Sequence, residues 1–188
     1  MTAQQCLIAE SYRATYATWN PATVGAGIAL SGGNLIATQS NGTNATAAST
    51  FTVSSGKWYW EVKMTTQNGG FNCVGIAISG YSNTGTLGGD VDGWAYINGQ
   101  RRYHNGTTNL YGASIVAGGV IGVYLDAGAG SVGFTYNGVD QGSAYTGLTG
   151  PFYAACSPDS SGGVMTANFG ATSLTYTPPT GYAPGLYY

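Results

Sequence analysis

The sequence predicts an all-β protein, an antiparallel two-sheet β-sandwich with a short N-terminal arm. Residues 55–63 alternate bulky and polar side chains with the period of two that marks a half-buried strand. Short apolar runs recur along the chain with Gly, Asn and Pro turn signals between them, which is typical of antiparallel sandwiches. Helical periodicity is confined to the first residues of the chain, so no helical layer is expected.

Residues 1–18 differ from the rest of the chain because they carry a weak helical pattern, and they are interpreted as an N-terminal arm that docks on the domain or on a partner. The expected subunit contacts of this arm are Cys6, Leu7, Ile8 and Tyr12. Cys6 is either a free, inert thiol or an intermolecular link. Residues 19–188 are predicted to form one sandwich domain with an extended, proline-containing C-terminal tail.

The predicted central strand begins near residue 57 and runs to about residue 66. One of its faces carries Trp58, Trp60 and Val62, which we expect to build the main core. The opposite face carries the more polar side chains Lys57, Tyr59, Glu61 and Lys63.

A hairpin is expected at residues 28–38, before the central strand. Further strands are expected at residues 73–78, 93–97, 101–104, 120–126, 132–136, 139–145, 152–156 and 164–169. Loops are expected at residues 39–49, 79–92 and 107–119. Gly75 allows close approach by a neighbour. Asn137-Gly138 predicts a type I′ hairpin turn, because both central positions of that turn need positive φ.

The composition excludes several classes of protein. Only 6% of the 188 residues are charged and the net charge is −2, so phosphate contacts by Lys and Arg cannot drive nucleic-acid binding. No apolar stretch approaches the ~18 residues of a membrane span. Three cysteines are no disulfide framework, and Cys73 and Cys156 lie in apolar runs as expected for buried hydrophobic residues. The N-terminus lacks a signal-peptide pattern, which predicts synthesis in a cytoplasm and, if the protein is exported, exit by another route.

The ordered set of motifs resembles the SPRY domain, the core of the B30.2 family, in its phage and bacterial form. The matching segments are Ser55–Val62, Val74–Ala77, Gly93–Tyr96, Tyr103–Gly106, Val120–Asp126, Phe134–Val139, Phe152–Ala155 and Ala167–Gly170. The resemblance covers about residues 19–181. It implies a bent sandwich of the concanavalin type, acting as a non-enzymatic recognition module that binds through loops at one end.

No catalytic residue and no cofactor is predicted. His104 is the only histidine, and no motif around a Ser or Cys forms a triad with it. Asp90 and Asp92 are the only close carboxylate pair and the only weak candidates for a metal site; their Gly-rich loop lacks an EF-hand pattern. A ligand-binding groove is instead predicted from tyrosines and the single basic doublet, at Tyr81, Tyr96, Arg101, Arg102, Tyr103, His104 and Tyr111.

The predicted function is that of a non-enzymatic phage virion protein, a capsid, collar or tail-associated component made in the bacterial cytoplasm. Its expected partners are other virion proteins and copies of itself, with no nucleic acid and no membrane insertion. One alternative is an adhesin that binds a host receptor, protein or glycan. A further alternative is a polysaccharide hydrolase, for which Asp90 and Asp92 are the only carboxylates available as a pair.

Overall fold

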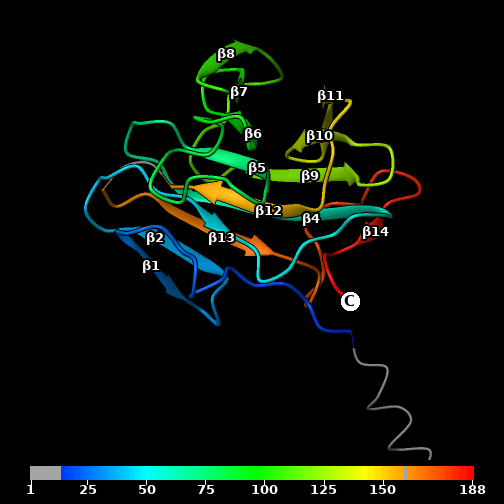
Figure 1. Cartoon of the computed structure of the whole chain (residues 1–188), viewed down its shortest axis with the longest axis horizontal. Coiled ribbons are helices and arrows are strands. Elements are labelled where there is room, and N and C mark those ends of the chain that lie inside the picture. The colour runs from blue at the N-terminus through cyan, green and yellow to red at the C-terminus, as the bar shows by residue number, and fades with distance from the viewer. Residues whose placement is uncertain (1–13, 159–160) are drawn as a thin grey trace, which may run out of the picture.

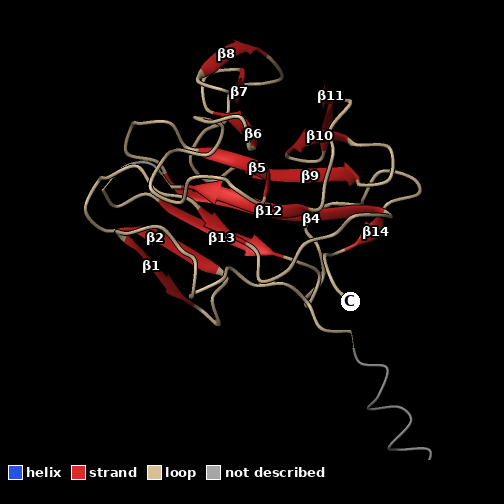
Figure 2. Ribbon diagram, viewed as in Figure 1, coloured by secondary structure: helices blue, strands red, loops and turns tan. Residues whose placement is uncertain are grey.

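The computed structural model describes residues 14–158 and 161–188 as two packed β-sheets (Figures 1 and 2). Neighbouring strands of the larger sheet follow the order β1 (Ile28–Ser31), β2 (Ile36–Gln39), β13 (Val164–Asn168), β4 (Lys57–Thr66), β9 (Val120–Asp126), β10 (Ser131–Tyr136) and β11 (Val139–Tyr145). The smaller sheet has the order β3 (Ala47–Ala48), β12 (Phe152–Ser157), β5 (Cys73–Ile78), β6 (Gly93–Ile97), β7 (Arg101–His104) and β8 (Thr107–Leu110). Every pairing within these two orders is antiparallel, which confirms the predicted two-sheet sandwich.

The main core lies between the two sheets. Trp60 and Val62 of β4 are fully buried there, as predicted, and meet inward-facing residues of the smaller sheet such as Ile76 and Tyr96. Trp58 is half-buried and packs against the edge of this core. The central strand therefore builds the core with the face that the sequence indicated.

The other face of β4 differs from the half-buried strand that the sequence predicted. Lys57 and Lys63 are exposed there, but Tyr59 and Glu61 are buried. The cause is the C-terminal segment, which runs over this face and adds β14 (Ala183–Pro184) as a short parallel partner of β4. The predicted tail is thus a structural layer that covers the sheet.

Two local predictions about glycine are confirmed. At Asn137 and Gly138 the φ angles are 48° and 80°, the positive values that a type I′ turn requires. A Cβ atom at Gly75 would lie 2.0 Å from the carbonyl oxygen of Trp94, so this position accepts no side chain. Gly138 thus permits the tight turn between β10 and β11, and Gly75 permits the close approach of β6 to β5.

The start and end of the described chain lie together. Tyr16 and Tyr187 form an isolated antiparallel bridge, and the N–H of Thr15 donates to the carbonyl of Tyr188 at 3.0 Å. Residues 14–18 of the predicted arm thus pack on the C-terminal segment. The predicted subunit contacts Cys6, Leu7, Ile8 and Tyr12 lie outside the described residues.

Cys73 and Cys156 are free and buried, as the sequence predicted. Burial raises the pKa of the Cys156 thiol above its ordinary value. Helices long and apolar enough to cross a membrane are not found in the part of the chain that the structure describes.

Candidate functional site

A second, smaller apolar cluster lies on the outer face of the six-stranded sheet, opposite the main core. Side chains that alternate with the core residues of β5, β6 and β12 form it, namely Cys73, Ala77, Ala95, Ile97 and Ala155. Leu87 covers them from the loop at residues 79–92, and Tyr81 and Tyr103 pack at the border. The predicted loop is therefore seated on the sheet by its own apolar anchor.

Buried hydrogen bonds fix this loop in place. The Ser157 hydroxyl accepts from the N–H of Leu87 at 2.8 Å and lies 2.9 Å from the Thr46 hydroxyl. Thr46 in turn donates to the carbonyl of Gly85 at 2.7 Å. Because these groups are buried and satisfied, they hold the loop in one conformation.

A pocket of about 360 Å³ opens between the loop and the end of the sheet. Polar side chains and two aromatic rings line it, with glycines where the loop comes closest: Asn44, Phe71, Ser82, Gly85, Thr86, Gly89, Asp90 and Tyr103. We call this the outer-sheet pocket. The rings of Phe71 and Tyr103 are stacked with centroids 5.5 Å apart, and the Arg101 guanidinium carbon lies 5.6 Å from the Phe71 centroid.

Asp90 closes one side of the outer-sheet pocket. Its carboxylate accepts from the backbone N–H of Ser82 at 2.7 Å and from that of Asp92 at 3.0 Å. This is the role of an Asp in a tight loop, which satisfies backbone amides with its side chain. Groups of three or more metal-ligating side chains are absent from the described residues, those around Asp90 and Asp92 included.

The seven residues predicted to line a groove divide between the two faces of the smaller sheet. Arg101 and Tyr103 face outward with Phe71, and Tyr81 lies beside Tyr153, with ring centroids 6.0 Å apart. Arg102 and His104 alternate with them on β7 and therefore face the other way.

The inward-facing members are held by the protein itself. Arg102 donates to the carbonyl of Ala144, and its guanidinium carbon lies 5.1 Å from the Tyr145 ring centroid. His104 stacks on Trp94, with ring centroids 4.9 Å apart, and its Nδ1 lies 2.7 Å from the carbonyl oxygen of Gly93. That distance makes Nδ1 the protonated nitrogen, because a carbonyl only accepts.

Tyr96 and Tyr111 belong to the core side. Tyr96 is fully buried, and its hydroxyl donates to the carbonyl of Ala113 at 2.5 Å; burial raises the pKa of Tyr96 to about 12. The hydroxyl of Tyr111 donates to the carbonyl of Gly142 at 2.5 Å, and burial raises its pKa as well. Burial likewise raises the pKa of Tyr81.

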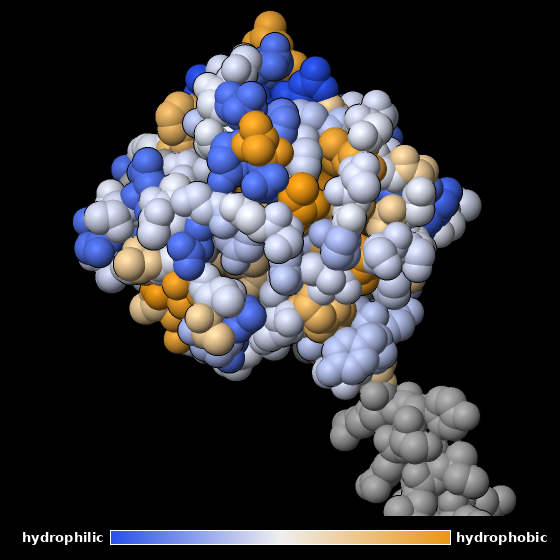
Figure 3. All heavy atoms as spheres, viewed as in Figure 1, coloured by the Kyte–Doolittle hydropathy of each residue, from blue (hydrophilic) through white to orange (hydrophobic). Residues whose placement is uncertain are grey.

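Sequence reasoning missed Phe71, Asn44, Ser82 and Thr86 in this pocket and Leu110 beside it. Leu110 belongs to β8, which the sequence treated as loop, and its side chain is 87% exposed. A signal for β8 was available: Asn105-Gly106 is a two-residue hairpin turn, with φ angles of 48° and 70°. Figure 3 shows hydrophobic and strongly hydrophilic residues side by side at this end of the molecule, where β7 and β8 lie in Figure 1.

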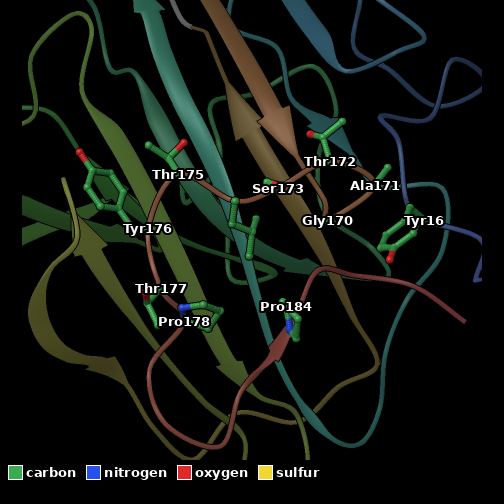
Figure 4. A pocket seen from close by; sticks show the side chains of 11 residues that line it. Tyr16, Gly170, Ala171, Thr172, Ser173, Thr175, Tyr176, Thr177, Pro178 and Pro184 are labelled. Carbon is green, nitrogen blue, oxygen red and sulfur yellow. The ribbon is translucent and has the colours of Figure 1, made fainter.

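A larger hollow, of about 530 Å³, lies over the eight-stranded sheet, far along the chain from the predicted residues (Figure 4). It is lined mainly by the segment at residues 170–178, with Tyr16 and Pro184, and its lining carries no charged side chain. Glu61 lies under this segment and accepts from the backbone N–H groups of Thr175 and Tyr176, both at 2.7 Å. The hollow therefore reflects how the C-terminal segment is fastened to β4.

Comparisons with known proteins agree with this geometry. The family model of the SPRY domain matches residues 57–172, which take in β4 to β13. The E3 ubiquitin-protein ligase RKP of Arabidopsis thaliana is 37% identical over 136 residues, which are 69% of this chain and 10% of the ligase. The chain thus spans about a tenth of the length of that relative.

Two solved structures share the fold. The SPRY domain of human HERC1 superposes with a TM-score of 0.67 at 22% identity, over 79% of this chain and 96% of that one. Stonustoxin superposes with a TM-score of 0.63 at 20% identity, over 82% of this chain and 27% of its own.

Proposed function

This chain belongs to the SPRY domain family, a family of protein-interaction modules, and we propose that it binds another protein through the outer-sheet pocket. One observation carries the proposal: two stacked aromatic rings, with an arginine over one of them, line a pocket whose loop is held by buried hydrogen bonds. Arg and aromatic side chains supply most of the energy at protein interfaces. A fixed loop loses little conformational freedom on binding.

The proposed role is recognition rather than catalysis. The carboxylate of Asp90 accepts hydrogen bonds from backbone amides. The ring of His104 stacks on Trp94 and is hydrogen-bonded to the carbonyl of Gly93. Both groups therefore serve the local structure, which supports a surface that binds without reacting.

Selection from a random heptapeptide display library tests the proposed surface. Peptides enriched on the wild-type domain should lose at least tenfold in affinity for the Phe71→Ala/Tyr103→Ala double variant. Ser173→Ala, in the larger hollow, is the matched control and should bind as the wild type does. Equal binding to all three proteins would contradict the proposed surface.

We further propose, from composition, that the binding partners are virion proteins of a phage, including copies of this chain, assembled in a bacterial cytoplasm. Because only 6% of the chain's residues are charged, its surface has little electrostatic repulsion to keep neighbouring subunits apart, which suits dense packing in a particle. The relatives described above come from a plant and from human, so the phage origin and subtype draw no support from them. Immunogold labelling of purified particles is the test, and unlabelled particles would refute this assignment.

A further inference from the structure

Strand β8 ends the six-stranded sheet and has no protection of the kind that edge strands usually carry. Its four residues, Thr-Thr-Asn-Leu, are all exposed and include no charge and no proline. Its pairing with β7 has no bulge, from the pair of Arg101 and Leu110 to the pair of His104 and Thr107. Such an edge is a template for a further strand.

The other sheet edges differ from β8 in register, length or exposure. The pairing of β11 with β10 shifts register twice, which twists that edge. The strand β3 has only two residues. On β1, the N–H of Ile28 already donates to the carbonyl of Gly25 at 3.2 Å. Only β8 among these edges has four residues that are all exposed, whereas Ile28 of β1 is buried and Leu30 is partly buried.

Two residues of β8 direct their backbone groups outward. The N–H of Tyr111 donates to the carbonyl of Gln100 at 2.9 Å, so by alternation Asn109 and Thr107 also face β7. Thr108 and Leu110 then point their N–H and C=O groups away from the sheet. Within residues 14–158 and 161–188 no backbone group pairs with them.

The charges around the β7–β8 hairpin are ordered along the strand. At the turn, the N–H of Asn105 donates to the carbonyl of Asp90, which brings the acidic loop to this end. At the other end lie Arg101, directly opposite Leu110, and Arg102. Neither arginine forms an ion pair with any described carboxylate, and Arg101 Nε is buried without a hydrogen-bond partner among the described residues. The end at Leu110 is thus positive and the end at the turn negative.

We propose that β8 binds an extended segment of another protein as an added strand, with an acidic side chain at the Leu110 end. The inference rests on the proposed function and names the kind of partner. Two strand spacings, roughly 10 Å, separate the added backbone from β7, a span that a glutamate and an arginine side chain bridge together. Leu110, which lies opposite Arg101 on the same face, then packs its apolar side chain beside the added strand.

N-methylation of the selected heptapeptides tests the backbone part of this inference with the wild-type protein. Methyl groups on the two alternate amides that face Thr108 and Leu110 should each weaken binding at least tenfold, because a donor is lost and the strands are forced apart. A methyl group on the amide between them should change affinity less than threefold. Equal effects at all three amides would overturn the proposal, and so would a selection that yields no linear peptide.

Variants of the protein give an independent readout. Thr108→Pro removes an outward N–H and leaves the ladder to β7 intact, so it should weaken binding at least tenfold, whereas Thr108→Val keeps the N–H and should bind normally. Replacing the acidic residue of the peptide with its amide should weaken binding to wild type severalfold but not to Arg101→Gln. Peptides that bind Thr108→Pro normally but do not bind Phe71→Ala/Tyr103→Ala would refute strand addition and support the pocket. Peptides that bind Phe71→Ala/Tyr103→Ala normally but do not bind Thr108→Pro would refute the pocket alone.

Discussion

Glu61 is the residue whose replacement tests the structure most directly. Its side chain is 2% exposed in the middle of β4, where its carboxylate accepts from the amides of Thr175 and Tyr176 at 2.7 Å and from the hydroxyl of Tyr59 at 3.3 Å. Glu61→Gln preserves the shape but turns one acceptor oxygen into a donor that faces an amide N–H. Losing one charge-assisted hydrogen bond and leaving a buried donor unpaired should lower the free energy of unfolding by about 2–4 kcal/mol.

Urea denaturation followed by tryptophan fluorescence measures this loss as a shift of the midpoint at unchanged slope. Lys57→Gln on the same strand is the control. It breaks the 3.3 Å ion pair with Asp126, but the lysine side chain is 52% exposed, so the expected loss is below about 1 kcal/mol. If Glu61→Gln costs no more than Lys57→Gln, the carboxylate does not fasten the C-terminal segment and the reasoning fails.

Three further predictions concern the core and the loop. The pKa of Tyr96, raised from 10.0 to about 12, predicts a stabilising contribution that is complete below pH ~10 and is lost as the pH rises through 12. The absorbance of tyrosinate should show a late-titrating group that Tyr96→Phe removes. An unchanged titration would contradict the burial of Tyr96. Gly75→Ala should lower the free energy of unfolding, measured by urea denaturation, by about 3 kcal/mol, because its Cβ would lie 2.0 Å from a carbonyl oxygen. The control Gly33→Ala has no atom within 4 Å of its Cβ and should cost about 1 kcal/mol, because its φ angle is positive. Equal losses would argue against the close approach at Gly75. Ser157→Ala should speed hydrogen exchange at the Leu87 amide about tenfold by removing its buried acceptor, and unchanged exchange would show that the loop is held by other contacts.

The strands that the sequence predicted best are those bounded by clear turn signals, whether or not the strand itself is an apolar run. Residues 73–78, 93–97, 101–104, 120–126 and 139–145 are strands with the predicted bounds. The turn chemistry on either side of each strand is encoded locally, and in residues 73–78, 93–97 and 120–126 the apolar run indicates the same element, so no long-range information is needed.

Elements that depend on a distant partner were not predictable in this way. The strands β3 and β14 have two residues each, and only their pairing with β12 and β4 makes them strands. The burial of Glu61 has the same origin. Alternation along β4 separates its two faces, but the segment that covers the second face lies far along the chain. Thr175, whose N–H donates to Glu61, is 114 positions away in the sequence.

The candidate site was predictable in composition but not in arrangement. The tyrosines and the arginine doublet identified the β6–β8 region, yet only the register shows that Arg101 and Tyr103 share the outer face of the sheet while Arg102 and His104 face the opposite way. Phe71 carried no signal, because a single aromatic residue after a glycine turn has no period. Its role follows from the stacking partner that the fold supplies.

The pairing of residues 15 and 16 with residues 187 and 188 has a consequence for how this domain can be handled. The two ends leave the sandwich at one pole, whereas the β7–β8 hairpin lies at the other (Figure 1). A linker of a few residues from Tyr188 to Ala14 would therefore close residues 14–188 into a ring, and new ends opened at the exposed Ala117–Gly118 turn would yield a circular permutant of these residues with every sheet intact. By the same geometry, the domain can be inserted into a surface loop of another protein without separating the two ends of that loop. The β7–β8 hairpin then points away from the site of insertion.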